Sequence, residues 1–251
     1  MAVKNFFPVE STSIHISVDV AALTVENDTL KVLTIECASD PFRGQRALPG
    51  GLLHNNETTE DGALRKLKED THLKPPKKYL EQLKTYGPLE RDPRGPVIAI
   101  VYLILLPPHE AQLSPSLPSR AQWQPVSQFA DRTTLAFDHN FVLEDAIERA
   151  RSKIEYTPIA TSFCPEEFTI SQLRKIYEAV WNTKVEPRNF NRKIQAAHIL
   201  ESTGKKEQSI GRPAELFRLK KHIAPNDFAL YPALLRPTRN STHLLKTVQN
   251  T

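Results

Sequence analysis

The sequence has few cysteines and no long apolar run. Its two cysteines, Cys37 and Cys164, form neither a metal-binding nor a redox spacing, so we expect both to be reduced. The longest apolar run, Val97 to Leu106, is half of the roughly 20 residues that a membrane-spanning helix needs, and it predicts a buried strand. Residues 1–10 lack the basic segment and apolar core of a signal peptide. These absences predict a cytoplasmic protein without a membrane partner.

The two halves of the chain differ in the sign of their net charge, because the first has fewer basic than acidic residues and the second has few acidic ones. Residues 1–150 contain 16 Lys or Arg and 20 Asp or Glu, a net charge of −4, whereas residues 151–251 contain 17 and 9, a net charge of +8. The formal total of +4 hides this difference. The asymmetry favours two domains, of which the second meets a polyanion such as nucleic acid. A basic but merely solvated surface is the alternative.

The first half begins with a hairpin pattern. Residues Ile16 to Val25 and Leu30 to Glu36 read as two strands, and the polar stretch Glu26 to Thr29 between them favours a turn. The glycine-rich turn Leu48 to Gly51 then leads toward a helix. On that helix Lys66, Glu69 and Asp70 are spaced by three and four residues, which places them on one face.

This stretch resembles the Nudix signature, G-x5-E-x7-R-E-U-x-E-E-x-G-U with U apolar. The positions that match it are Gly51, Glu57, Arg65, Leu67, Glu69 and Leu73. The resemblance implies a nucleotide-diphosphate pocket in which three carboxylates of the helix bind Mg²⁺. Here Lys66 replaces the first acid, Asp70 shortens the third, and His72 replaces the closing glycine. An amphipathic helix that matches by chance is the alternative.

Lys66 lies four residues before Asp70 and is expected to pair with it. The ammonium group would then occupy the space and the negative charge that a metal needs. We therefore predict no metal ligand, no catalytic residue and no cofactor, with Mg²⁺ bound weakly or not at all. The alternative is an active, Mg²⁺-dependent ADP-ribose pyrophosphatase in which Lys66 turns away from Glu69 and Asp70.

A second stretch carries a narrower resemblance. Tyr79 to Gly87, followed by Arg91-Asp92-Pro93-Arg94-Gly95, resembles the Nudix branch that contains ADP-ribose pyrophosphatases and the NAD-metabolism regulators called NrtR. The two arginines suit a phosphate or a ribose. In that family the counterpart of Phe137-Asp138-His139 closes the fold beside the site. The effector-binding residues that we predict are Arg43 and Arg46, at the pocket mouth, with Glu69, Asp70, Arg91, Arg94 and His139.

The domain boundary is placed where the charge changes sign. Pro107 to Pro125 is rich in proline and predicts a surface loop, and a helix is expected from about Asn140 to Ser152. We predict an effector-binding domain at residues 1–155, a linker at 156–166 and a DNA-binding domain at 167–251.

The basic half begins with a helix that Thr169 and Gln172 cap reciprocally, and Pro187 suits the first turn of a second helix. The second helix has an apolar face, with Phe190 and Ile194, opposite a polar one. The polar face, whose side-chain types pair with guanine and adenine edges, contains Arg188, Asn191, Arg192 and Gln195.

Beyond this helix the chain predicts a hairpin. Glu201 to Gly204 is expected to end the helix, Lys205 to Gly211 to form a basic loop, and Pro213 to Leu219 to form a strand. Two helices followed by a hairpin with Lys205, Lys206 and Arg212 at its tip predict a winged helix-turn-helix that binds DNA. A small helical interaction domain with a solvated basic surface is the alternative.

Residues 14–221 as a whole resemble the NrtR family, most clearly in Arg188 to Lys193 and Gly211 to Phe217. The resemblance implies an α/β (α+β) Nudix sandwich followed by a C-terminal winged helix-turn-helix. It also implies a cytoplasmic, nucleoid-associated homodimer that binds a palindromic operator of NAD synthesis or salvage genes and is released by ADP-ribose. Repression is the family expectation, and a regulator of the same architecture that senses a sugar such as arabinose is an alternative. Residues 222–251 lie outside the resemblance.

Overall fold

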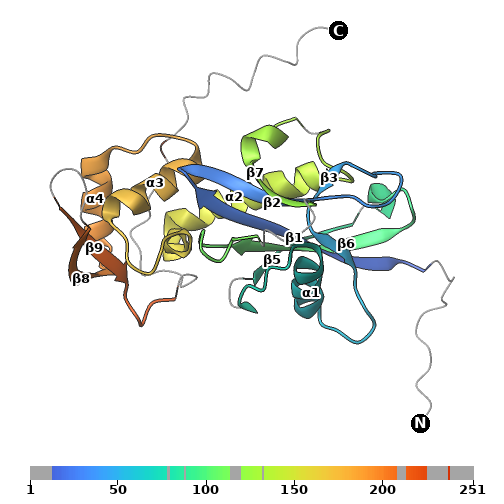
Figure 1. Cartoon of the computed structure of the whole chain (residues 1–251), viewed down its shortest axis with the longest axis horizontal. Helices are drawn as coiled ribbons and strands as arrows, with labels where there is room; N and C mark the ends of the chain where they lie inside the picture. Colours follow the sequence, from blue (N-terminus) through green and yellow to red (C-terminus); the bar gives the residue numbers. More distant parts are fainter. Residues whose placement is uncertain are drawn as a thin grey trace, which may run out of the picture. The chain divides into compact units, whose positions relative to one another are not determined.

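The computed structural model divides the chain into two compact units (Figure 1). It describes residues 13–77, 80–87, 89–113, 120–131, 133–207, 213–224 and 237. The first unit runs to Arg149, except for residues 27–29, which are grouped with the second unit from Ala150 onward. The division falls inside the helix α2 (His139–Tyr156) rather than in the predicted linker. The predicted linker, residues 156–166, contains η4 (Pro158–Phe163), most of whose residues are buried.

A seven-stranded mixed sheet forms the framework of the first unit. The central path is β3-β2-β1-β6-β5, with β4 paired to β1 and β7 paired to β2. The strands are β1 (His15–Glu26), β2 (Thr29–Glu36), β3 (Arg46–Ala47), β4 (Gly50–Leu52), β5 (Leu80–Tyr86), β6 (Val97–Leu105) and β7 (Ala121–Pro125). Two short 3-10 helices, η2 (Leu89–Arg91) and η3 (Val126–Phe129), lie in its connections.

The hairpin between β1 and β2 is confirmed. Its two turn residues, Asn27 and Asp28, have φ angles of 51° and 56°. A type I′ turn requires positive φ at both central positions, and Asn and Asp tolerate that conformation better than most residues. The turn chemistry and the strand pattern therefore specify the same structure.

The apolar run is confirmed as the buried strand β6. It pairs with β1 in parallel and with β5 in antiparallel register. Most of its residues are buried, which is why the run is continuously apolar rather than alternating. No helix in the described part of the chain is long and apolar enough to cross a membrane.

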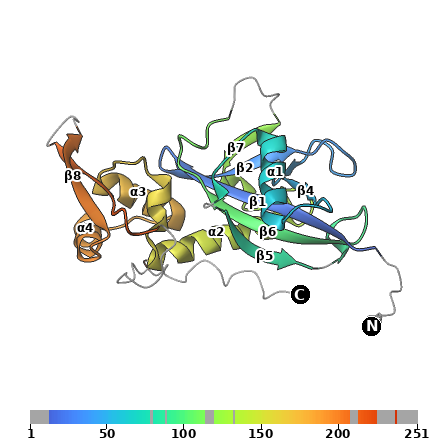
Figure 2. The same cartoon turned by 90° about the horizontal axis from the view of Figure 1, so that it is seen from below.

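Helix α1 (Thr59–Thr71) covers one face of the sheet, and the first part of α2 lies on the other (Figures 1 and 2). Ala63 and Leu67 of α1 are fully buried in one core cluster with Val18 and Val20 of β1. Fully burying a side chain as large as that of Leu67 or Val18 contributes roughly 1.5–3 kcal/mol, so α1 is fixed firmly against β1.

Both ends of α1 are capped by side chains or backbone of the signature stretch. Thr58 accepts a hydrogen bond from the backbone N–H of Asp61. His72 ends the helix with φ 61°, and its N–H donates to Lys68 O at 2.8 Å. Because glycine adopts this conformation most easily, the position explains why the Nudix signature closes on glycine.

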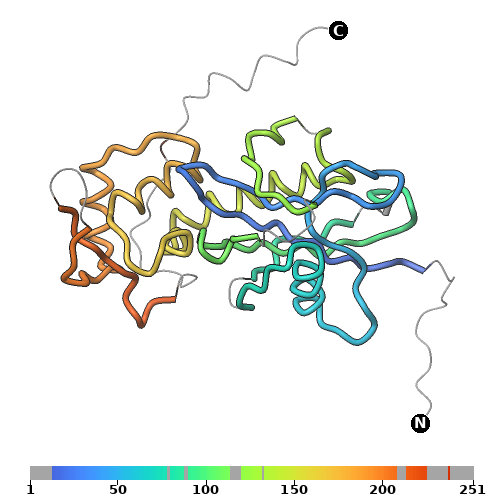
Figure 3. The backbone as a smooth tube through the Cα atoms, in the orientation of Figure 1, coloured from blue at the N-terminus to red at the C-terminus, as the bar shows by residue number. Residues whose placement is uncertain are grey.

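The second unit contains two helices and a hairpin. In chain order they are α3 (Ile170–Trp181), α4 (Pro187–Ala196), β8 (Leu200–Glu207) and β9 (Ala214–Leu219), and Figure 3 traces this path from orange to red. The capping box of Thr169 and Gln172 is confirmed, and Pro187 occupies the first turn of α4 as predicted. The rings of Phe190 and Tyr177 pack in a T-shaped arrangement with 5.2 Å between centroids, which joins the two helices.

One boundary in this unit was predicted wrongly. Glu201 to Gly204 does not end a helix, because α4 has already ended at Ala196 and these residues belong to β8. Lys205 and Lys206 therefore lie on a strand rather than in a loop. The pairing of β8 with β9 is interrupted between Ser202 and Lys206, where Gly204 has φ 73°. The strand β8 therefore contains a bulge, which its polar sequence did not lead us to predict.

Candidate functional site

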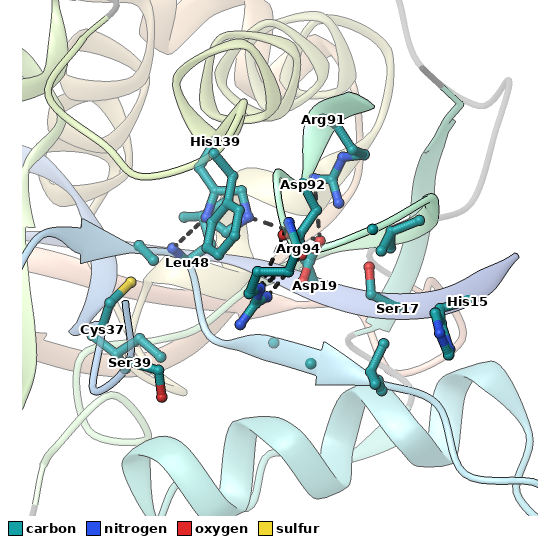
Figure 4. A pocket seen from close by; sticks show the side chains of 18 of the residues that line it. His15, Ser17, Asp19, Cys37, Ser39, Leu48, Arg91, Asp92, Arg94 and His139 are labelled. Atoms are coloured by element: carbon teal, nitrogen blue, oxygen red, sulfur yellow. Dashed lines mark hydrogen bonds and ion pairs between the residues drawn. The ribbon is translucent and has the colours of Figure 1, made fainter. Parts of the chain in front are cut away.

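A cavity of about 470 Å³ opens in the first unit (Figure 4). Its volume lies within the range of small-molecule sites. Alternate residues of β1, namely His15, Ser17 and Asp19, line one side. The strand β4 borders the same side. Much of the remaining wall comes from Arg91, Asp92, Arg94, Gly95, Val97, Phe137 and His139.

Arg91 is the buried cation of this wall. Its side chain is 4% exposed, and its guanidinium donates to both carboxylate oxygens of Asp138 and lies 3.5 Å from Asp19 Oδ2. Burial raises the pKa of Asp19 to about 6, although the charge of Arg91 acts in the opposite direction. The ion pairs fix Arg91 as part of the wall.

His139 holds the glycine-rich turn beside the cavity. Its Nδ1 accepts a hydrogen bond from the backbone N–H of Leu48 at 2.9 Å. Burial lowers the pKa of His139 to about 3, so the imidazole is neutral at physiological pH. Since Nδ1 is the acceptor, Nε2 carries the proton, and it lies 3.9 Å from Asp19 Oδ2. His139 both lines the cavity and positions Leu48.

An aromatic ring and a guanidinium lie together at another part of the wall. Arg94 is 55% exposed, binds Asp92 at 2.7 Å and lies 5.1 Å from the centroid of the Phe137 ring. Phe137 also packs against Phe42, with 4.4 Å between ring centroids. Its φ of 57° is rare for a bulky residue, and such strain is concentrated at binding sites.

Three of the seven predicted effector residues line this cavity, namely Arg91, Arg94 and His139. Arg43 points its guanidinium at Asp40 instead and is exposed. Arg46 does not line the cavity either, and its guanidinium donates to Gln122 and Gln124 of β7. Contact of Arg43 or Arg46 with the effector stays a prediction.

The sequence did contain a signal for two residues that we missed, Ser17 and Asp19. They alternate with apolar residues inside a strand that is otherwise buried. Polar side chains at such positions require a partner. The alternation alone, however, does not say whether that partner is protein or ligand.

Gly50 and Gly51 separate the cavity from the charged face of α1. A Cβ at Gly50 would lie 2.1 Å from Asp19 Oδ1, and a Cβ at Gly51 would lie 2.8 Å from Lys66 Cε. Asp70 Oδ2 accepts from the N–H of Gly50 at 3.2 Å. The predicted residues Glu69 and Asp70 thus do not line the cavity. Asp70 instead accepts a hydrogen bond from Gly50, a residue that does line it.

The acids of α1 are bound by cations. Lys66 Nζ lies 3.2 Å from both Glu69 Oε2 and Asp70 Oδ1, which confirms the expected pair. Arg65 binds Glu57 at 2.6 Å and Glu69 at 3.2 Å. Within the described ranges no group of three or more His, Cys, Asp or Glu side chains could hold a metal ion. This arrangement does not fit Mg²⁺, which needs oxygen ligands free of competing cations.

The second unit exposes the predicted polar face of α4. The exposed side chains are Arg188, Asn191, Arg192 and Gln195. On the opposite side of the helix Phe190 and Ile194 are 1% exposed. On β8, Lys206 is exposed and Lys205 binds Glu167 at 2.9 Å, while Arg212 lies outside the described residues. Contact of any of these side chains with DNA stays a prediction.

Two family models match the chain, the NUDIX domain over residues 15–145 and the NrtR DNA-binding winged helix domain over residues 160–219. The chain is 32% identical over 204 residues to the "ADPR responsive transcriptional repressor NtrR" of Acinetobacter baylyi, and the match covers 80% of each protein.

Solved structures agree with these matches. Shewanella oneidensis NrtR complexed with a 27mer DNA superposes with a TM-score of 0.72 and 33% identity, over 82% of this chain and 93% of that one. The NUDIX domain of the same protein complexed with ADP ribose gives a TM-score of 0.50 and 34% identity, over 58% and 94%.

The fold and the cavity therefore define a Nudix domain joined to a winged helix, and the predicted fold class is confirmed. The chain belongs to the NrtR family of transcriptional regulators.

Proposed function

We propose that this chain is an ADP-ribose-responsive transcriptional repressor of NAD synthesis and salvage genes. In this proposal the cavity of the first unit binds ADP-ribose, and the second unit binds a palindromic operator as a homodimer. The observation that carries it is the presence, in one NrtR-family chain, of a nucleotide-sized cavity and of a helix with an exposed face of Arg, Asn and Gln.

The composition of the cavity supports a nucleotide ligand. Arg94 is exposed beside the Phe137 ring, so phosphate and base find a cation and an aromatic surface close together. Ser17 and Asp19 supply polar groups elsewhere in the wall. ADP-ribose combines these chemistries in one molecule.

The exposed face of α4 supports DNA binding. Arg188, Arg192, Asn191 and Gln195 have the donor and acceptor groups that read base edges in the major groove. A recognition helix in a two-fold dimer reads half-sites that are spaced by turns of the duplex, which accounts for the palindromic operator in the proposal.

The effector acts through a difference in affinity. ADP-ribose can release the operator only if it binds more tightly to a conformer that holds DNA poorly. Typical couplings between two sites change affinity by about 5- to 150-fold. The same factor must appear in the reverse direction, so operator DNA must weaken ADP-ribose binding equally.

A mobility-shift titration tests this function. We expect a DNA fragment from upstream of NAD salvage genes to be retarded, and ADP-ribose to weaken the binding by about 5- to 150-fold. Arabinose in place of ADP-ribose tests the sugar-sensing alternative, and an unrelated DNA fragment controls for charge alone. Retardation that ADP-ribose leaves unchanged contradicts the proposed effector.

We further propose that the chain binds ADP-ribose without Mg²⁺ and does not hydrolyse it. The contacts of Lys66 with Glu69 and Asp70 support this, because they neutralise two acids that an active enzyme offers to the metal. Incubation of the wild-type protein with ADP-ribose and Mg²⁺ is therefore expected to release no AMP.

A matched pair of variants sharpens this prediction. Lys66→Glu is expected to create a Mg²⁺ site that calorimetry detects, because three acids would then share the helix face. Lys68→Glu makes the same charge change at an exposed position of α1 and is expected to bind no additional metal. Rapid AMP release by the wild-type chain would overturn the proposal and favour the active hydrolase.

A further inference from the structure

One hydroxyl group in the cavity wall has no partner. Ser17 is 6% exposed and lines the cavity from β1 (Figure 4). Its Oγ is buried and has no hydrogen-bond partner among the described residues. Most buried side-chain polar atoms are hydrogen-bonded, and each exception needs an explanation.

The surroundings of Ser17 on the sheet offer no replacement partner. Its neighbour on β6 is Ala99, which is fully buried, and its neighbour on β4 is Leu52. Neither side chain can accept or donate a hydrogen bond. The cavity, which Ser17 lines, is the remaining side from which a ligand group can meet this hydroxyl.

The chemistry along β1 indicates which group that is. His15 and Asp19 lie two residues before and after Ser17, and all three line the cavity, as alternate residues of a strand do. A carboxyl, a hydroxyl and an imidazole in a row match sugar hydroxyls, which both donate and accept. A phosphate fits poorly beside the carboxyl of Asp19, whereas Arg94 offers an exposed guanidinium that pairs with Asp92.

We propose that Ser17 is a specificity-determining residue of the cavity, whose hydroxyl hydrogen-bonds a sugar hydroxyl of the bound effector. The inference rests on the proposed function, in which the cavity binds ADP-ribose. It assigns the β1 side of the cavity to a ribose of that ligand.

Ser17→Ala in the full-length protein tests the inference by two opposite changes. The affinity for ADP-ribose, measured by titration calorimetry, is expected to fall by about 2- to 13-fold, the effect of one hydrogen bond. The melting temperature without ligand is expected to rise by about 2–4 °C, because the variant no longer buries an unsatisfied hydroxyl. Substitution of a residue with a purely structural role would not raise the melting temperature and lower the affinity for ADP-ribose together.

Thr24→Val is the matched control on the same strand. Thr24 is 2% exposed and its hydroxyl donates to Leu106 O at 2.8 Å, outside the cavity lining. Loss of that bond is expected to lower the melting temperature and to leave ADP-ribose affinity unchanged. The two variants therefore shift the melting temperature in opposite directions, and only Ser17→Ala lowers the affinity for ADP-ribose.

The outcomes are separable. If Ser17→Ala leaves the affinity for ADP-ribose unchanged, or lowers the melting temperature, the role of Ser17 is overturned. The proposed function still stands in that case, provided that the wild-type chain binds ADP-ribose. No ADP-ribose binding by the wild-type chain overturns the proposed function and this inference with it. Titration with ADP identifies the sugar: a loss of affinity that persists with ADP assigns Ser17 to the adenosine ribose, and a loss confined to ADP-ribose assigns it to the terminal ribose.

Discussion

Arg91→Ala is expected to destabilise the first unit by about 3–5 kcal/mol at neutral pH. The guanidinium is 4% exposed and is bound by Asp138 and Asp19. Its removal leaves carboxylates without their cation in a buried wall, which costs more than the pair itself contributes. Urea unfolding at pH 7, followed by the fluorescence of the chain's tryptophans, measures the loss.

The size of this effect is expected to depend on pH. The folded-state pKa of Asp19 is raised to about 6, above its unfolded value, so the stability linked to its protonation is complete below about pH 4 and lost as pH rises through 6. Arg91 holds that pKa down, so Arg91→Ala raises it further. The variant should therefore differ from the wild-type chain more at pH 7 than at pH 4.5.

Arg43→Ala is the control, because Arg43 also pairs with an aspartate of the first unit, Asp40, but both side chains are exposed. Exposed ion pairs contribute only about 0–1 kcal/mol, so this variant is expected to unfold almost as the wild-type chain does. Equal losses for Arg91→Ala and Arg43→Ala would refute the buried role of Arg91.

Arg192→Ala is expected to weaken operator binding by about 5- to 150-fold, the equivalent of about 1–3 kcal/mol for one base-reading side chain. Arg192 lies on the exposed face of α4 and donates to Asn189 at 2.8 Å, so its removal does not disturb the buried face. Affinity measured in a mobility-shift titration at fixed salt is the readout, and ADP-ribose binding should be retained.

Lys175→Ala removes the same charge from an exposed position of α3 and serves as the comparison. Without a base contact, its effect should be small and similar for all DNA sequences. If the two variants bind the operator equally, α4 is not the recognition helix.

Local sequence patterns predicted the local structure well. The pair of Lys66 and Asp70 follows from a spacing of four within one helix, and it is present at 3.2 Å. The same is true of the capping box at Thr169 and of the turn at Asn27 and Asp28. In each case the interacting groups are neighbours along the chain, so spacing alone identifies them.

The cavity depends on contacts that spacing cannot predict. Arg91 meets Asp19 over 72 positions of sequence, and His139 meets Leu48 over 91. The contact of Arg46 with Gln124 is likewise invisible in the spacing, since the two residues lie 78 positions apart. The strand β8 was missed because its polar sequence becomes a strand only through pairing with β9.

The two glycines between the cavity and α1 are subject to unequal evolutionary constraints. A Cβ at position 50 would strike Asp19 and the rigid backbone of β1, so no change on α1 can make room for it. A Cβ at position 51 would strike only the flexible end of Lys66. Among descendants of this chain, position 50 should stay glycine throughout, whereas position 51 should vary only in step with position 66.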